Sequence, residues 1–223
     1  MIAGIILAAG KSSRMGRIKQ LLPLDGKPLL QHAIDAAAAA ALSEVIVVLG
    51  HEAERIAADI RLNPGARIAV SREYASGAGW SLAAGLQATS PEVDAAVILL
   101  GDQPGISPAI IDAAIALYRR SGARVVRAIY GEEPGHPVLL DRSIWKHLIG
   151  TREEGGARLL IERHPEWVIP LVLDPPPPPD VDTWESYWML ATRISHTSST
   201  EAADSGRPAS LHDGFAPRHR VDD

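Results

Sequence analysis

The sequence predicts an α/β fold, a three-layer α/β/α sandwich in which helices cover both faces of a mostly parallel β-sheet. Short apolar runs typical of buried strands alternate along the chain with stretches of about 10–14 residues that have helical spacing. Hydrophobic residues make up 46% of the 223 residues, which is enough for one α/β core. Prolines stand where helices are expected to begin, at Pro28 and Pro108.

The first third of the chain is expected to supply three strands and two helices. Apolar residues recur at helical spacing after Pro28, and the turn residues at 63–65 end the second helix. The expected elements are a buried strand at 5–7, a helix from residue 28 that the alanines at 36–41 prolong, a buried strand at 44–50, a helix at 51–62 and a short strand at 67–71.

The middle of the chain continues the alternation. We expect a glycine-containing loop at 76–80, a helix at 81–89, the most apolar strand at 95–100, a helix at 108–121 and a strand at 124–130. Ligands of such sheets bind outside the carboxyl ends of the parallel strands. The sequence therefore predicts one site, built from the loops at 10–19, 76–81 and 101–104.

The last part of the chain is expected to complete one domain over residues 1–193. A loop entering a strand is expected at 135–140, helices at 143–149 and 156–163, a strand at 168–173, a rigid polyproline spacer at 175–179 and a closing helix at 184–193. Residues 194–223 are rich in Ser, Thr, Asp, Gly, Pro, His and Arg, so we expect a disordered tail there.

Composition excludes several classes of protein. The net charge of −5 argues against a general nucleic-acid binder. The chain has no cysteine, so a disulfide framework, a thiolate metal site and a Cys nucleophile are excluded, and a cytoplasmic location is expected. No segment reaches the roughly 18 apolar residues that a membrane helix needs. We also expect a monomer.

The loop after the first strand has the character of a phosphate-binding loop. Gly10 and Gly16 bound it, and cations lie within or just after it: Lys11, Arg14, Arg17 and Lys19. Small residues allow close approach of backbone N–H groups, and the cations supply charge for a triphosphate. Neither the Walker A pattern nor the dinucleotide pattern G-x-G-x-x-G fits, because Ile5 and Ser12 stand where those patterns need glycine. The remaining alternative is an ordinary turn with solvated cations.

A carboxylate is expected opposite this loop. Asp102 follows the most apolar strand and lies just before Pro104. A carboxylate in this position is suited to holding Mg²⁺ against a triphosphate. The alternative for Asp102 is capping of the helix near Pro108. The second carboxylate is expected from Asp182, braced by the proline run, with Asp180 as a competitor; Asp182 has the alternative of capping the closing helix.

Two further stretches are candidates for substrate contacts. The segment at 76–81 contains Gly77 and Gly79 and could be capped by Ser81, so its backbone suits reading the edge of a base, although it fits a flexible turn as well. His136, between a glycine and a proline, is either a structural loop histidine or a residue of the acceptor pocket.

Taken together, the motifs at 7–16, Lys19, 22–24, 101–104, 135–137 and 180–183 resemble the MobA-like nucleotidyltransferases, and most closely the molybdenum cofactor cytidylyltransferases. The resemblance covers residues 1 to about 192, in order. It implies a Rossmann-like fold of the nucleotide-diphospho-sugar transferase type. The Ala8-Ala9-Gly10 form of the first motif resembles the cytidine-using members, which places CTP above GTP.

The resemblance implies transfer of CMP from CTP to the terminal phosphate of molybdenum-bound molybdopterin, with release of pyrophosphate. It implies nucleotide binding for Leu7, Ala8, Ala9, Gly10, Lys11, Ser12, Gly77, Gly79, Ser81 and Asp102. It implies phosphate binding for Arg14 and Lys19, catalysis for Arg14, Lys19 and Asp102, Mg²⁺ binding for Asp102 and Asp182, and acceptor binding for Gln103 and His136. A transient molybdoenzyme or maturation partner is also implied.

One departure from the family pattern concerns the acceptor. This chain has Glu153-Glu-Gly-Gly-Ala-Arg158 where the family tends to have Gly-Asp-x-Gly-Ala-Arg. Three alternatives therefore stay open: a nucleotidyltransferase with another nucleotide or acceptor, such as GTP or a sugar or polyol phosphate; a non-catalytic cofactor carrier or maturation factor; and a nicotinamide oxidoreductase. The absent dinucleotide pattern counts against the last.

Overall fold

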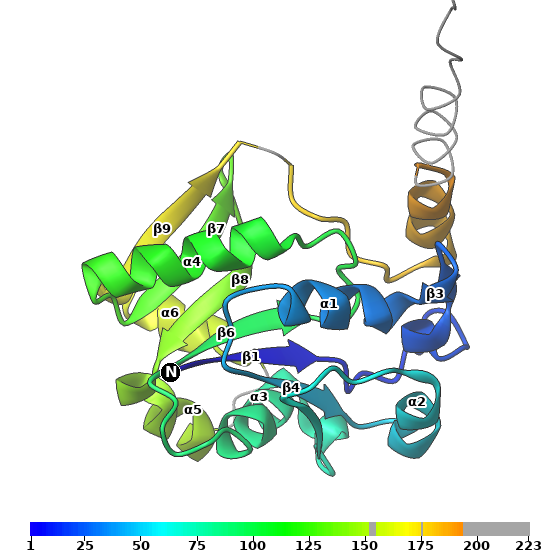
Figure 1. The fold of residues 1–223 in the computed structure, drawn as a ribbon, viewed down its shortest axis with the longest axis horizontal. Helices are drawn as coiled ribbons and strands as arrows, with labels where there is room; N and C mark the ends of the chain where they lie inside the picture. Colours follow the sequence, from blue (N-terminus) through cyan, green and yellow to red (C-terminus); the bar gives the residue numbers. More distant parts are fainter. Residues whose placement is uncertain (152–154, 175, 194–223) are drawn as a thin grey trace, which may run out of the picture.

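A seven-stranded sheet forms the centre of the computed structural model, which describes residues 1–151, 155–174 and 176–193. Its order is β5-β4-β1-β6-β8-β7-β9 (Figure 1). The strands are β1 (Ile2–Leu7), β4 (Glu44–Leu49), β5 (Ala66–Val70), β6 (Ala95–Leu100), β7 (Val125–Tyr130), β8 (Glu133–Asp141) and β9 (Val168–Leu173). Only β8 runs antiparallel to its neighbours, so the prediction of a mostly parallel sheet is confirmed.

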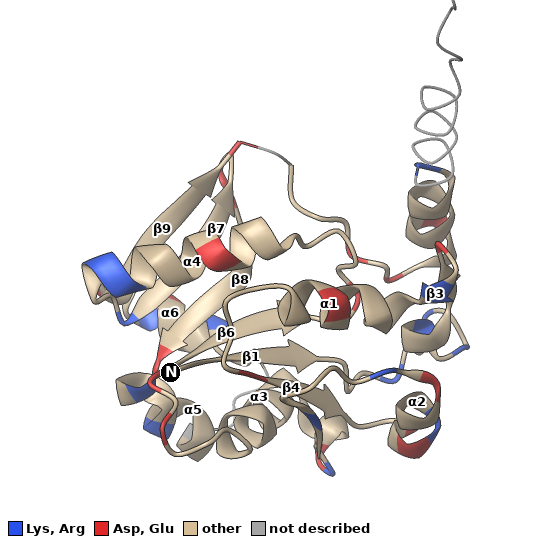
Figure 2. Cartoon of the chain, in the orientation of Figure 1, with Lys and Arg blue, Asp and Glu red and all other residues tan. Residues whose placement is uncertain are grey.

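Helices cover both faces of the sheet, as predicted. One face packs on α1 (Leu29–Ala38), α2 (Ala53–Asp59) and α4 (Pro108–Ser121), and the other on α3 (Ala78–Gln87), α5 (Trp145–Thr151) and α6 (Arg158–Arg163). Successive strand residues point to opposite faces, so Ile6 belongs to the first core and Ile5 to the second, and both are fully buried. Figure 2 shows that β1 and β6, at the centre, carry no charged residue.

A third, smaller core lies beyond the end of the sheet. It joins the loop after β1, the hairpin of β2 (Pro23–Leu24) and β3 (Lys27–Pro28), and the closing helix, described over residues 184–193. Figure 1 shows this helix beside β3. The buried residues of this third core are Met15, Leu22, Leu24, Leu29, Val181, Tyr187 and Leu190. In the described part of the chain, no helix is long and apolar enough to cross a membrane.

Single-turn 3₁₀ helices complete the described chain: η1 (Lys19–Leu21), η2 (Tyr74–Ser76), η3 (Arg142–Ile144) and η4 (Pro165–Trp167). The predicted tail at 194–223, and with it the predicted end of the domain, lies outside the described residues, as does Pro175 at the start of the polyproline spacer.

Two predicted helices are longer than the observed ones. The alanine run does not continue α1 beyond Ala38, because the chain must turn to let Ser43 donate from its backbone N–H and its hydroxyl to the carbonyl oxygen of Ile2, both at 2.8 Å. The second helix ends at Asp59 because the side chain of Gln31 takes up both backbone hydrogen bonds of Arg61.

The start of α3 was predicted wrongly. The helix begins at Ala78, three residues before Ser81, because Gly77 at φ 120° turns the chain in a conformation open to glycine alone. Ser81 therefore does not cap the helix. It lies buried in the first turn, with its hydroxyl 3.5 Å from that of Ser71.

Candidate active site

The loops after β1 and β6 leave the sheet side by side. Leu7 pairs in register with Leu100, and the N–H of Gly101 donates to the carbonyl oxygen of Leu7 at 3.0 Å. A Cβ added to Gly101 would lie 2.8 Å from the Cβ of Ala8, so the close approach of the two loops requires glycine at this position. The predicted phosphate loop and the predicted metal ligand Asp102 therefore share one edge of the sheet.

The loop after β1 is held from inside by a residue that the sequence reasoning missed. Gln20 is 3% exposed, and its Nε2 donates to the carbonyl oxygens of Ala8 at 2.9 Å and Gly10 at 3.2 Å. The hydroxyl of Ser12 donates to Gln20 Oε1 and accepts from the backbone N–H of Lys19. The only signal in the sequence is a polar residue between Lys19 and the apolar residues that follow.

The stretch that carries Asp182 reaches the same place along a different route. The N–H of Val181 donates to the carbonyl oxygen of Asp102 at 3.0 Å, and Val181 is fully buried in the third core. Thr183 and Ser186 bond to each other at the start of the closing helix. Capping is thus supplied by Thr183 and Ser186, and the carboxylate of Asp182 makes its bonds elsewhere.

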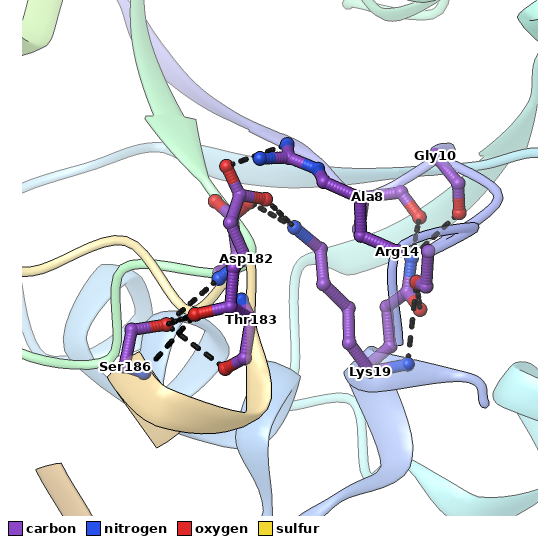
Figure 3. Close-up of polar contacts among 10 residues, drawn as sticks. Ala8, Gly10, Arg14, Lys19, Asp182, Thr183 and Ser186 are labelled. Carbon is purple, nitrogen blue, oxygen red and sulfur yellow. Dashed lines mark hydrogen bonds and ion pairs between the residues drawn. The ribbon is translucent and has the colours of Figure 1, made fainter. Parts of the chain in front are cut away.

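Lys19 joins the two predicted metal ligands. Its Nζ lies 2.5 Å from Asp102 Oδ2 and 2.8 Å from Asp182 Oδ1, while Arg14 donates to Asp182 Oδ2 at 2.9 Å (Figure 3). The Lys19 side chain is only 12% exposed. Burial alone would lower the pKa of Lys19, but the carboxylates of Asp102 and then Asp182 outweigh it and raise the pKa, so the ammonium stays charged.

The two candidates for the second carboxylate differ in their surroundings. Burial opposes ionisation of Asp182, yet hydrogen bonds and charge from Lys19 and then Arg14 hold its pKa below the ordinary value. Asp180 faces the opposite balance, because partial burial and the negative charges of Asp102 and Asp182 raise its pKa despite a hydrogen bond from Gln103. Asp182 thus differs from Asp180 in that its carboxylate forms ion pairs with Lys19 and Arg14.

Carboxylates that share a cation fit the requirements of Mg²⁺. Within the described ranges no three His, Asp or Glu side chains converge on one point, so there is no all-protein metal cage there. Magnesium usually takes one or two carboxylates and completes its shell with water and substrate phosphates. Asp102 and Asp182 supply oxygen donors of that kind, and the two carboxylates lie close together, since both contact the Lys19 ammonium.

The remaining predicted nucleotide residues lie around this centre in two groups. Lys11 and Ser12 line an open cavity of about 610 Å³ beside α2, and the Lys11 ammonium stands 5.8 Å from the centre of the Tyr74 ring. Gly77 and Gly79 form the start of α3. Their assignment to the base and ribose stays a prediction.

The predicted acceptor residues lie next to Asp102 and in a smaller cavity. Gln103 is 7% exposed. His136 lines a cavity of about 170 Å³ together with Leu7 and Leu100. Burial, and after it the charge of Arg127, lowers the pKa of His136 to about 4, so its imidazole is neutral at neutral pH. Glu153 and Glu154, in the stretch that departs from the family pattern, lie outside the described residues.

The chain is similar to known proteins over most of its length. The model of the MobA-like NTP transferase domain matches residues 4–167. Nicotine blue oxidoreductase from Paenarthrobacter nicotinovorans is 32% identical over 200 residues, covering 85% of this chain and 96% of that protein. The crystal structure of a homologue of Mycobacterium tuberculosis Rv0371c, from Mycobacterium sp. strain JC1, is 32% identical with a TM-score of 0.80, covering 88% and 98% of the two chains.

A structure of M. tuberculosis Rv0371c itself in complex with manganese is also 32% identical, with a TM-score of 0.74 over 86% of this chain and 98% of that one. The family match takes in Arg14, Lys19, Asp102 and His136 but ends before Asp182. The position of Asp182 beside Lys19 is therefore an observation from the structure, independent of the family match.

Proposed function

The chain belongs to the MobA-like NTP transferase family, and from this premise we propose that this nucleotidyltransferase moves CMP from CTP to the terminal phosphate of a molybdopterin-type cofactor, with Mg²⁺ and with release of pyrophosphate. The observation that carries the proposal is the cluster of Arg14, Lys19, Asp102 and Asp182 at the carboxyl ends of β1 and β6. It combines two cations suited to a triphosphate with two carboxylates suited to a divalent metal.

The cluster supports a mechanism without a general base. A phosphate monoester has its second pKa near 6, so the acceptor is already an anionic nucleophile at neutral pH. The protein must align acceptor and α-phosphorus and neutralise the charge that grows on the leaving pyrophosphate. Arg14 and Lys19 would bind the phosphates, exchanging their present carboxylate partners for phosphate oxygens. Asp102 and Asp182 would hold Mg²⁺, which supplies Lewis-acid polarisation of phosphate oxygens when bound.

The nucleotide, the metal and the acceptor are each supported by a separate observation. CTP is favoured over GTP by Ala8 and Ala9 alone. A divalent metal is supported by the manganese complex of Rv0371c. A molybdopterin-type acceptor is supported by the Gly135-His136-Pro137 motif, whose histidine lines a cavity next to Leu100. We further propose a cytoplasmic monomer that meets a molybdoenzyme or maturation factor transiently.

A second candidate function has one specific observation in its favour. The relative from P. nicotinovorans is named an oxidoreductase, and it matches 85% of this chain. A nicotinamide-dependent reaction would place a dinucleotide at the same strand ends. The missing dinucleotide pattern around Gly10 and Ser12 argues against it, so the experiment must include both classes of ligand.

Thermal shift measurements with CTP, GTP, ATP, NAD and NADP, each with and without Mg²⁺, separate the two candidates. A ligand at 100 times its dissociation constant stabilises the fold by about 2.7 kcal/mol, which is readily measured. We expect the largest shift with CTP, and only in the presence of Mg²⁺. A shift with a nicotinamide nucleotide alone would overturn the proposal in favour of an oxidoreductase.

Substitutions in the cluster test the roles of its members. Lys19→Ala and Arg14→Ala should each lower the rate of CMP transfer by about 10²–10³, which corresponds to the loss of one preorganised donor. Asp102→Ala should cost at least as much. Arg119→Ala, which removes an exposed cation from the last turn of α4, is the matched control. Near-normal turnover in either cation variant would refute the phosphate-binding role.

A further inference from the structure

Arg127 is a charged residue inside an otherwise apolar strand. Its neighbours in β7 are Val125, Val126, Ala128 and Ile129. The Arg127 Nε is buried and has no hydrogen-bond partner among the described residues. A buried donor without a partner costs free energy, more so when it belongs to a charged group. A guanidinium kept in such a place at this cost is typical of a site that binds an anion.

The cavity beside Arg127 has positively charged side chains in an otherwise apolar lining. The polar side chains that line it are Arg127, His136 and Arg158. The other side chains facing it are apolar: Leu7, Ala78, Leu82, Ile98, Leu100, Val138, Ala157 and Ile161. No carboxylate of the described residues lines this cavity. The carboxylate whose charge acts on Arg127 is that of Glu162, which is exposed and lies 3.9 Å from the Nε of Arg158.

The cavity adjoins the candidate active site and is small. Leu7 and Leu100 are the last residues of β1 and β6, immediately before the loops that carry Arg14 and Asp102. Its volume of about 170 Å³ is well below the roughly 300–1,000 Å³ of pockets that enclose a whole small molecule. It therefore has room for one group of a substrate whose remainder lies in the open site.

The neutral imidazole of His136 complements the guanidinium. A neutral ring carries one N–H donor, and it adds a hydrogen bond without adding a second fixed charge in the same space. A guanidinium offers donors in a fork that matches two oxygens of a phosphate or carboxylate. Arg127 and His136 together thus suit an oxyanion better than a neutral polar group.

We propose that Arg127 binds the phosphate group of the acceptor substrate in this cavity, with Arg158 at its edge and His136 as a second donor. This inference rests on the proposed function, since it assigns the acceptor-binding residue of the same reaction. It adds a residue that neither the motifs nor the family resemblance singled out.

Kinetics of the Arg127→Met variant test the inference. We expect the KM for the acceptor to rise by about 10–100-fold, in keeping with the loss of a charge-assisted bond, while the KM for the nucleotide stays unchanged. Arg127→Lys should recover part of the loss, because it restores charge without the fork. Arg120→Met, at the exposed end of α4, is the matched control and should change neither KM.

Stability separates a binding role from a structural one. Because the Nε of Arg127 has no partner in the described chain, Arg127→Met should have a melting temperature equal to or higher than that of the parent protein. A clear fall in melting temperature together with loss of nucleotide binding would show that Arg127 is structural, and would overturn the inference.

A titration with inorganic phosphate tests the site without any turnover. In a ¹⁵N spectrum of arginine side chains, the Nε–H signal that Arg127→Met removes should shift on addition of phosphate. No shift would overturn the inference, even if CMP transfer occurs. A shift combined with an unchanged acceptor KM in the variant would overturn the assignment to the acceptor, since the cavity would then bind only free phosphate. If CTP binds but no acceptor reacts, the proposed function fails, and this titration still decides whether Arg127 binds an oxyanion.

Discussion

Lys19 connects parts of the chain that lie far apart in the sequence. Its partners Asp102 and Asp182 stand 83 and 163 residues away. The motifs predicted that these residue types serve one site, and the structure brings Arg14, Lys19, Asp102 and Asp182 together. The sequence left open whether Asp180 or Asp182 would join this cluster, because both follow the proline run; the ion pairs with Lys19 and Arg14 distinguish Asp182.

Residues that act through burial were not predictable in the same way. Gln20 and Arg127 stand in no motif, and their roles follow from which backbone groups and cavities surround them. Arg127 did leave one trace in the sequence, a charge within an apolar run. A partly buried charge in a strand that is otherwise a core strand is a signal worth testing in other chains of this kind.

His136 should make the stability of the protein depend on pH. Its pKa is about 4 in the folded protein, held there by burial and by Arg127 against a weaker opposite effect of Asp102, and about 6.5 in the unfolded chain. Between these values the unfolded state binds more protons, so stability falls as the pH is lowered from about 6.5 toward 4. We expect a loss of at most about 2 kcal/mol between pH 7 and pH 5.

Chemical denaturation of the parent protein and His136→Gln across this pH range measures the effect. The variant has no titrating group at this position, so the difference between the two free energies of unfolding should change by the stated amount. If the free energies of unfolding of the two proteins change in parallel from pH 7 to pH 5, the pKa of His136 is not lowered in the folded state.

At the scale of elements, the strands were predicted more closely than the helices. The strand at 168–173 and the helix at 108–121 match β9 and α4, because proline and apolar runs mark their ends. Errors arose where a tertiary hydrogen bond or a glycine decided a boundary, as at Gln31 and Gly77. The antiparallel direction of β8 follows from sheet pairing, which no local pattern contains.

Glu44 should be important for joining β4 to its surroundings. Its side chain is 7% exposed; it accepts from the N–H and the hydroxyl of Ser90 at 2.8 and 2.6 Å, and from Arg67 on β5 at 2.9 Å. Burial acts to raise the pKa of Glu44, but these bonds outweigh it and lower the pKa. We expect Glu44→Gln to cost about 2 kcal/mol at pH 7, in the range of hydrogen bonds to charged groups.

The pH dependence distinguishes this explanation from a simple loss of packing. A carboxylate with a lowered pKa stabilises the fold above its unfolded value of about 4.3, and this contribution is lost as the pH falls through the folded value. The difference between the parent protein and Glu44→Gln should therefore shrink below about pH 4 in denaturation experiments. Glu54→Gln, at an exposed position of α2, is the control and should have little effect at any pH.

At the scale of the whole molecule, alternation and motifs predicted the three layers and the family. What they did not contain is the third core, which anchors the closing helix to the hairpin of β2 and β3. The hydroxyl of Tyr187 donates to the carbonyl oxygen of Pro23 at 2.5 Å, and the indole N–H of Trp184 donates to that of Met15 at 3.2 Å. This attachment places Asp182, just before the helix, opposite Lys19.

Tyr187→Ala should test this attachment. Tyr187 is 5% exposed, so its truncation should cost about 3–5 kcal/mol, and it should weaken Mg²⁺-dependent nucleotide binding because Asp182 loses its support. Met189→Ala is the matched control, since Met189 is 59% exposed on the same helix and should change stability by no more than about 0.5 kcal/mol. Unchanged nucleotide affinity in Tyr187→Ala, measured by titration calorimetry, would show that Asp182 is positioned without the helix.

The mutual pairing of Arg14, Lys19, Asp102 and Asp182 has a consequence for how fast a nucleotide arrives. The two cations and two carboxylates cancel, so long-range attraction of an anion to the free site depends on the other cations of the loop, Lys11 and Arg17. The on-rate for a metal-bound nucleotide should then depend on ionic strength less steeply than four loop cations would imply, because screening acts on a smaller field. Selectivity would be exercised after encounter, when each internal partner is exchanged for one of the ligand's.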